Sequence, residues 1–211
     1  IQLSGPGLIA DHPGQDSAFH SVFWSVDNGL AFGMRGNQLK SEATCMARNI
    51  TPSVVFSSIT ADALNQGQPL EAHFNVSIEC LDQSASRTES QRMVIGIQVS
   101  EGAYRAARNL GLVNAENGVR ALLSDDYGAE GIAQGVAIFL SNGLTGEDMM
   151  FVGQSNLSGH GTDAGWYPVS NAALVNTSGD TGTQHYLQNY TAILKRMDHK
   201  TVVAGKVSAT A

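Results

Sequence analysis

The residues with the clearest potential for catalysis lie in "SNLSGHGTDAGWYP", where Ser158, His160 and Asp163 follow one another closely. A serine nucleophile, a histidine base and an aspartate that orients the base are the parts of a hydrolytic triad. These groups normally converge from separate loops, whereas neighbours on one glycine-rich turn rarely align. The chain also lacks the Gly-x-Ser-x-Gly pattern of a nucleophile elbow. We therefore interpret the stretch as a solvated loop and predict that the protein is not an enzyme.

A second candidate for chemistry is "SDDYGAEG" at residues 124–131, whose three carboxylates are ligands of the kind that Ca²⁺ prefers. The spacing does not match the alternating ligands of an EF-hand loop, so we interpret the segment as a charged turn. The 6 histidines are scattered, and neither cysteine has a CxxC or CxxH neighbour. The sequence therefore predicts no metal site and no cofactor.

The two cysteines, Cys45 and Cys80, indicate a disulfide if the protein is exported. Charged residues make up only 15% of the chain, and glycine, serine, threonine and asparagine are abundant, which is typical of β-rich extracellular proteins. A bridge enclosing about 35 residues would contribute roughly 3 to 4 kcal/mol to stability. The alternative is a pair of buried free thiols in a cytosolic protein.

The charge and length exclude several classes of protein. With a net charge of -7 and only 12 Lys+Arg, the 211-residue chain has no basic run that could neutralise a nucleic-acid backbone. No stretch approaches 18 consecutive apolar residues, so no membrane-spanning helix is expected. Ile1 does not open a signal peptide, and we expect that any export signal has been removed.

The elements that would position such residues are short β-strands separated by turns. In "LEAHFNVSIEC" every second residue is apolar, which predicts a strand with one buried face and places Cys80 in the core. Alanine and arginine at helical spacing around Ala103 to Leu110 predict a short helix or turn. This pattern favours an all-β, antiparallel sandwich. The predicted strands are residues 53–59, 70–80, 92–100, 135–142, 185–194 and 201–211.

The N-terminal part differs from the rest. Residues 1–40 hold two prolines near their start and a turn, "DNG", that predicts a hairpin at Asp27 to Gly29. We interpret this part as a linker, an N-terminal hairpin or the end of a preceding receptor-binding domain, and residues 41–211 as the main domain. Whether residues 1–44 contribute a strand to that domain stays open.

Three features together resemble the pilin domain of bacterial chaperone-usher (type 1/P-like) fimbrial subunits. The first is the spacing of Cys45 and Cys80; the second is a G-V-x-I-x-L strand followed by a turn; the third is an ending of the form Y-x-A-x-L, a loop, and A-G-x-V-x-A-x-A. The resemblance covers about residues 45–211, and the ending is its most specific part. The matching positions are Gly135, Val136, Ile138, Leu140, Asn142, Gly143, Tyr190, Ala192, Leu194, Ala204, Gly205, Val207, Ala209 and Ala211.

The resemblance implies an incomplete immunoglobulin-like β-sandwich that lacks its last strand. In that family a periplasmic chaperone first fills the resulting groove, an outer-membrane usher assembles the subunits, and a neighbouring subunit then donates the missing strand. The implied location is the extracellular bacterial fimbrium. The resemblance places the following residues along the donor-strand groove: Val54, Phe56, Val207, Ala209 and Ala211.

The position of the subunit in a pilus is predicted from its first residues. "IQLSGPGLIADHPGQDS" alternates only over Ile1 and Leu3 and contains two prolines, which remove ladder donors. We therefore predict a tip adhesin or a minor tip subunit, with a host glycan or protein receptor as a further partner. A shaft pilin with an atypical N-terminal extension is the first alternative. A secreted carbohydrate-binding or hydrolytic β-sandwich, with Trp166 and Tyr167 stacking on sugar, is the second.

Overall fold

The computed structural model of the protein describes residues 45–81, 94–154, 161–169, 172–178 and 183–211, all within the structural unit Ala43–Ala211. The hairpin predicted at residues 27–29, and residues 1–40 as a whole, lie outside the described residues. The elements in chain order are β1 (Cys45–Arg48), α1 (Ala61–Asn65), β2 (Leu70–Leu81), β3 (Val94–Ile95), α3 (Glu101–Asn109), β4 (Gly118–Val119), β5 (Val136–Asn142), β6 (Asp148–Met149), β7 (Phe151–Val152), η2 (Thr162–Ala164), β8 (Tyr167–Pro168), β9 (Ala173–Ser178) and β10 (Thr183–Arg196).

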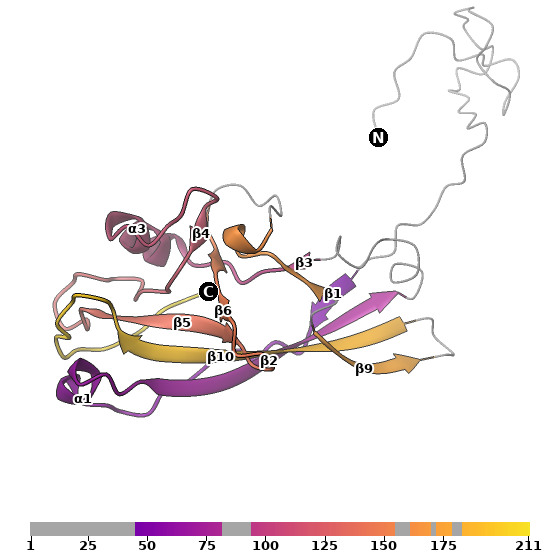
Figure 1. Cartoon of the computed structure of the whole chain (residues 1–211), viewed down its shortest axis with the longest axis horizontal. Coiled ribbons are helices and arrows are strands. Elements are labelled where there is room, and N and C mark those ends of the chain that lie inside the picture. Colours follow the sequence, from indigo (N-terminus) through magenta and orange to yellow (C-terminus); the bar gives the residue numbers. More distant parts are fainter. Residues whose placement is uncertain (1–44, 82–93, 155–160, 170–171, 179–182) are drawn as a thin grey trace, which may run out of the picture. The chain divides into compact units, whose positions relative to one another are not determined.

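The main sheet is antiparallel and has the strand order β1-β2-β10-β5-β6 (Figure 1). Strand β10 lies at its centre, paired with β2 from Thr183↔Leu81 to Leu194↔Leu70. On its other side β10 pairs first with β9 and then, from Tyr190 to Arg196, with β5. The fold is therefore all-β and sandwich-like, as the sequence predicted.

The alternation of residues 70–80 sets which face of β2 is buried. Val76, Ile78 and Cys80 are buried, whereas Glu71 and His73 on the other face are exposed. Cys80 lies directly opposite Cys45 of β1, and the two form the predicted disulfide, with a Cα–Cα distance of 4.1 Å. The bridge thus fastens the edge strand β1 to the core of the sheet.

A second layer covers the inner face of the main sheet (Figure 1). It contains the β3–β8 and β4–β7 strand pairs and helix α3. Ser100 begins α3 as its N-cap, and its side chain accepts a hydrogen bond from Ala103 N–H. Gly111, with φ of 70°, follows the C-cap Leu110, so the short helix predicted at this place is confirmed.

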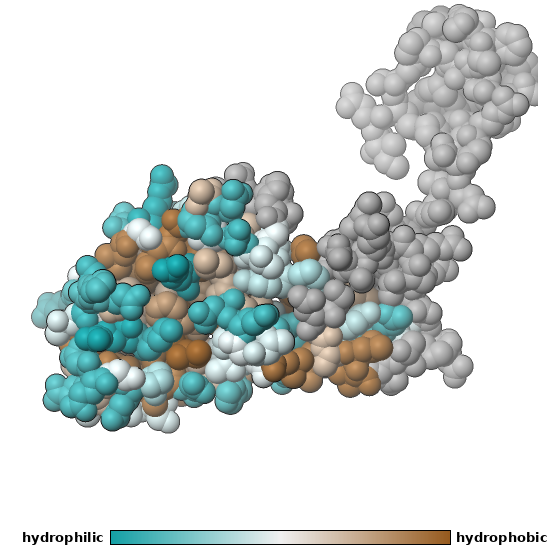
Figure 2. Space-filling model, in the orientation of Figure 1, coloured by the Kyte–Doolittle hydropathy of each residue, from teal (hydrophilic) through white to brown (hydrophobic). Residues whose placement is uncertain are grey.

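The buried side chains form two hydrophobic clusters. The larger lies between the layers and includes Cys80, Leu123 and Tyr190. The smaller includes Leu64 of α1 and Leu194 of β10. The partly buried side chain of Ile138 packs against both. Leu174 and Val175 of β9 are exposed, and Figure 2 shows hydrophobic surface over this part of the sheet.

Three of the predicted strands are wrong in extent. Residues 53–59 form no strand, the described residues 94–100 contain only β3 and a bridge at Gln98, and residues 201–211 contain only isolated bridges at Val203 and Lys206. Alternation reports which side chains can face a core, but a strand also needs a neighbouring backbone. Residues 53–59 and residues 201–211 each have an edge that no other described backbone pairs with.

Candidate functional site

The described unit has a groove made of two contiguous cavities. Their volumes are about 530 Å³ and about 700 Å³. Four residues line both cavities and so join them: Val54, Phe56, Ile138 and Ala209. We refer to the two cavities together as the groove.

Apolar side chains make up most of the lining of the groove, with serine and threonine as its main polar residues. Beneath it lie side chains of the main sheet, among them Val76 of β2, Leu140 of β5 and Leu194 of β10. No aspartate, glutamate, lysine, arginine or histidine is among the residues that line it. Such a surface favours an occupant that offers apolar side chains and backbone hydrogen bonds.

The C-terminal segment, residues 203–211, borders the groove with one edge bonded and the other open. Lys206 N–H donates to the Gly131 carbonyl at 2.8 Å, and the Ser208 carbonyl accepts from Asp125 N–H at 3.0 Å. The alternate residues Val207 and Ala209 have no backbone hydrogen bond within the described part of the chain. Their N–H and C=O groups therefore form an unpaired strand edge.

Residues 53–59 provide a second open edge. Strand β1 ends at Arg48, and Asn49, with φ of 41°, turns the chain away from β2. Thr51 still donates from its hydroxyl to the Asn75 carbonyl at 3.3 Å. From residue 53 to residue 59 the backbone makes no hydrogen bond to any described residue. Two segments that are far apart in sequence thus border one groove with unpaired backbone.

The five residues predicted for the groove all contribute to its lining. Val54 and Phe56 are half-buried, while Val55 between them is 82% exposed. Val207 and Ala209 are half-buried, and Ala211 is exposed and lines only the larger cavity. Half-buried and exposed residues therefore alternate along both segments that border the groove.

Gly205 allows the C-terminal segment to approach the loop beside it. A Cβ at this position would lie 2.6 Å from the carbonyl carbon of Ile132 and 2.8 Å from the Gly131 oxygen, and it would also strike Ala133 N. A larger residue would push the segment away from residues 131–133. The glycine of the A-G-x-V ending therefore has a packing role that the sequence motif did not explain.

The acidic turn interpreted from "SDDYGAEG" holds the C-terminal segment. Ser124 Oγ accepts from Ser208 N–H at 3.2 Å, and the Asp125 carboxylate accepts from both Thr210 N–H at 3.2 Å and Thr210 Oγ at 2.7 Å. The composition of the turn indicated only a charged, solvated loop. Its contact with the end of the chain was not predicted, because no local pattern relates positions more than eighty residues apart.

The two aromatic residues predicted as ligand contacts are partly buried. Tyr167 Oη accepts a hydrogen bond from Met150 N–H at 2.6 Å, and burial raises the pKa of Tyr167. The indole Nε1 of Trp166 is buried and has no hydrogen-bond partner among the residues that the structure describes. The prediction that Trp166 and Tyr167 stack on sugar stays untested.

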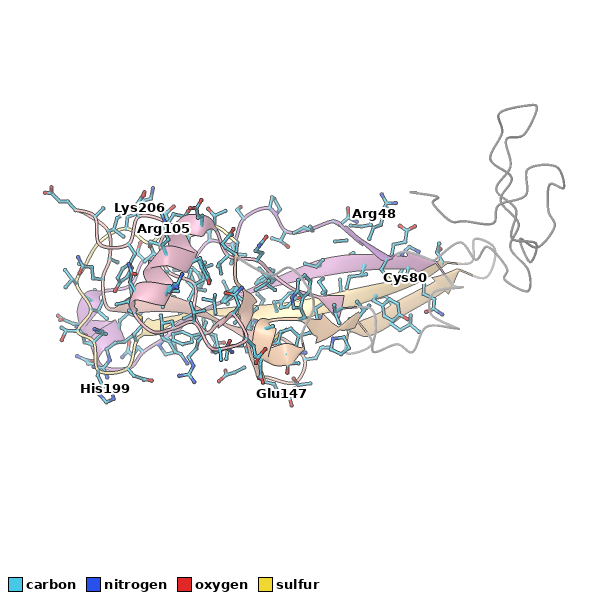
Figure 3. All side chains as sticks on the ribbon, turned by 90° about the horizontal axis from the view of Figure 1, so that it is seen from above. Arg48, Cys80, Arg105, Glu147, His199 and Lys206 are labelled. Carbon is cyan, nitrogen blue, oxygen red and sulfur yellow. A yellow bond between two sulfur atoms is a disulfide. The ribbon has the colours of Figure 1, made fainter. Side chains whose placement is uncertain are left out.

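Of the candidate triad, only Asp163 lies within the described residues. Ser158 and His160 are outside the described residues, and Asp163 lies in η2, where its carbonyl accepts from Asn114 Nδ2 at 2.6 Å. Figure 3 shows Arg48 and Cys80 at one end of the sheet, with His199 and Lys206 at the other. The disulfide therefore lies far from Lys206 of the C-terminal segment (Figure 3).

Comparison with known proteins supplies one match. A family model described as "Fimbrial protein" matches residues 33–211. The curated proteins and the solved structures contain no match to the chain.

Proposed function

This chain belongs to the fimbrial protein family, and from that premise we propose that its groove receives a β-strand donated by a neighbouring pilus subunit. The family is one of structural pilus subunits, which interact with other pilus subunits and are located in the extracellular pilus. No helix in the described ranges is long and apolar enough to cross a membrane.

The observation that carries the proposal is the pair of open edges along an uncharged apolar groove. A strand lying in the groove would satisfy the unpaired backbone of Val207 and Ala209 and cover Val54 and Phe56 with alternate apolar side chains. An exposed edge of this kind otherwise promotes aggregation. The fold is, on this proposal, an immunoglobulin-like sandwich completed by another chain.

Further partners follow from the same groove. We propose that a periplasmic chaperone covers it before assembly and that an outer-membrane usher exchanges the chaperone for the next subunit. The tip adhesin or minor tip position, and with it a host glycan or protein receptor, is part of the proposal. The two prolines and poor alternation of residues 1–17 make this stretch an unsuitable donor strand.

The test measures thermal unfolding of the oxidised protein with and without a synthetic donor peptide. The peptide has about ten residues, alternates valine or isoleucine with threonine or serine, contains no proline and spans roughly 33 Å when extended. At a concentration of about 100 Kd it should stabilise the protein by about 2.7 kcal/mol and raise Tm by roughly 5 to 10 °C. A peptide of the same composition with its apolar residues grouped together should have no effect.

Two variants make the test specific to the groove. Ala209→Asp places a charge in the apolar lining and should abolish the rise in Tm. Ala129→Asp makes the same change at an exposed alanine outside the groove, and this variant should still show the rise in Tm. A wild-type protein whose Tm does not respond to any alternating peptide would contradict the proposal.

The tip position has its own test. A synthetic peptide of residues 1–20 should not raise Tm, because a tip subunit does not donate a strand. A rise in Tm comparable to that given by the alternating peptide would instead identify a shaft pilin, or a domain that fills its own groove.

A further inference from the structure

Side chains, not the carbonyls of a neighbouring strand, accept the hydrogen bonds that the end of the C-terminal segment donates. At Lys206 the backbone N–H donates to a carbonyl, that of Gly131. At Ser208 and Thr210 the N–H groups donate to side-chain oxygens, Ser124 Oγ at 3.2 Å and Asp125 Oδ1 at 3.2 Å. The N–H groups of these last residues therefore depend on two side chains of one turn.

The Asp125 carboxylate is the main acceptor in this arrangement. Its Oδ2 accepts from Thr210 Oγ at 2.7 Å, and its Oδ1 accepts from Thr210 N–H and from Ser100 Oγ. The Asp125 N–H also donates to the Ser208 carbonyl at 3.0 Å. Hydrogen bonds to a carboxylate are roughly twice as strong as those between neutral groups. Asp125 thus binds the segment through both its backbone and its charge.

Helix α3 fixes Asp125 from the other side. Ser100 caps the helix by accepting from Ala103 N–H at 3.1 Å while its hydroxyl donates to Asp125. Ser100 N–H also donates to the Thr210 carbonyl at 2.9 Å. A Cβ at Gly102 would lie 2.6 Å from the Asp125 carbonyl oxygen, so the first helical turn packs directly against the aspartate. Ser100 and the first turn of α3 therefore fix the Asp125 carboxylate, which in turn fixes Thr210.

We propose that Asp125 is a positioning residue of the groove, whose carboxylate aligns the open edge of Val207 and Ala209 for the incoming strand. Asp125 lines neither cavity, so it acts through Thr210 and not by touching the occupant. The proposal rests on the proposed function, since the donated strand is the ligand that the aligned edge would bind. It assigns a role in binding to a turn that the sequence marked only as charged.

The test combines hydrogen exchange in the free protein with binding of the alternating peptide. In Asp125→Ala the amides of Ser208 and Thr210 should exchange at least tenfold faster, while those of β2 and β10 are unchanged. The peptide should bind roughly tenfold to hundredfold more weakly, with most of the change in its dissociation rate. Asp125→Asn, which retains one acceptor oxygen, should give an intermediate loss.

Asp126→Ala is the matched control. It removes the same charge from the adjacent position, where the exposed side chain makes no hydrogen bond within the described part of the chain. Exchange and affinity should both stay at the wild-type level. A double-mutant cycle with Thr210→Ala should be strongly non-additive, because both changes remove the same hydrogen bonds.

Three results would overturn the proposal, and they are distinguishable. Unchanged exchange in Asp125→Ala and Asp125→Asn would mean that the carboxylate does not fix the segment. Faster exchange with unchanged affinity would mean that it fixes the segment without aligning it for a strand. A wild-type protein that binds no alternating peptide would remove the proposed function itself, whatever the exchange rates of the variants.

Discussion

Phe74 of β2 and Tyr190 of β10 lie directly opposite each other, and their rings stack with centroids 5.0 Å apart and planes 18° apart. Tyr190 is only 1% exposed, and Phe74 also lines the larger cavity of the groove. The stack therefore links the centre of the main sheet to the inner surface of the groove. Its buried phenol has a consequence for stability in alkali.

We predict that the protein loses stability above about pH 10. Burial raises the pKa of Tyr190 well above its ordinary value, so the folded state keeps the phenol neutral where the unfolded chain ionises. The stability is fully present below the unfolded pKa and is lost as pH rises toward the folded one. Urea unfolding between about pH 8 and about pH 11.5 should show a falling midpoint, with a smaller fall in Tyr190→Phe. Equal slopes in the two proteins would contradict the assignment.

Removal of the disulfide should destabilise the domain by about 4 kcal/mol. Cys45 and Cys80 are 35 residues apart, and the bridge lowers the entropy of the unfolded chain. Urea unfolding of the double variant Cys45→Ser, Cys80→Ser against the wild type measures the loss. Dithiothreitol should lower the wild-type midpoint and leave that of the variant unchanged. A variant as stable as the oxidised wild type would show that the bridge does not contribute.

Gly205→Ala should destabilise the protein by about 1 to 3 kcal/mol, because the added Cβ overlaps the backbone of residues 131–133. The neighbouring substitution Ala204→Ser, at an exposed position, should cost almost nothing. Urea midpoints of the two variants provide the comparison. The idea of close packing at Gly205 would be abandoned if both variants unfolded at the wild-type midpoint.

Phe56→Ala should weaken binding of the alternating peptide by roughly tenfold, which corresponds to about 1.4 kcal/mol of lost apolar contact. Val55→Ala should weaken binding much less, because Val55 borders the smaller cavity but is 82% exposed. Titration of a fluorescently labelled peptide measures both affinities. Equal losses at the two positions would indicate that residues 53–59 do not present one face to the occupant.

The sequence predicted the elements whose stabilising contacts are local or periodic. The alternation of residues 70–80 located β2 and its buried face, and the apolar run at residues 135–142 located β5. The even count of cysteines, in a chain whose composition indicated export, favoured the disulfide of Cys45 and Cys80. The two strands follow from side-chain patterns that a single segment carries by itself.

The remaining features depend on contacts between distant segments. Residues 53–59 alternate as a strand does, yet they pair with no neighbouring strand in the described structure. The alternation within a segment cannot indicate whether a partner strand lies beside it. Asp125 lies in a turn whose composition is that of any solvated loop, and its role arises only when Thr210 reaches it. The packing role of Gly205 likewise depends on residues 131–133.

The place of Ile138 between the two hydrophobic clusters bears on how the domain unfolds. The groove passes between a cluster that contains Cys80 and a smaller one that contains Leu64, and Phe56 and Ala209 pack against different clusters. Ile138 packs against both clusters, which are also joined along β5 and β10, so with the groove open we expect the smaller cluster to unfold before the larger. On the proposed function, an apolar strand laid across Ile138 would join the clusters into one cooperative unit, and occupancy would then decide whether the domain melts in one step or two.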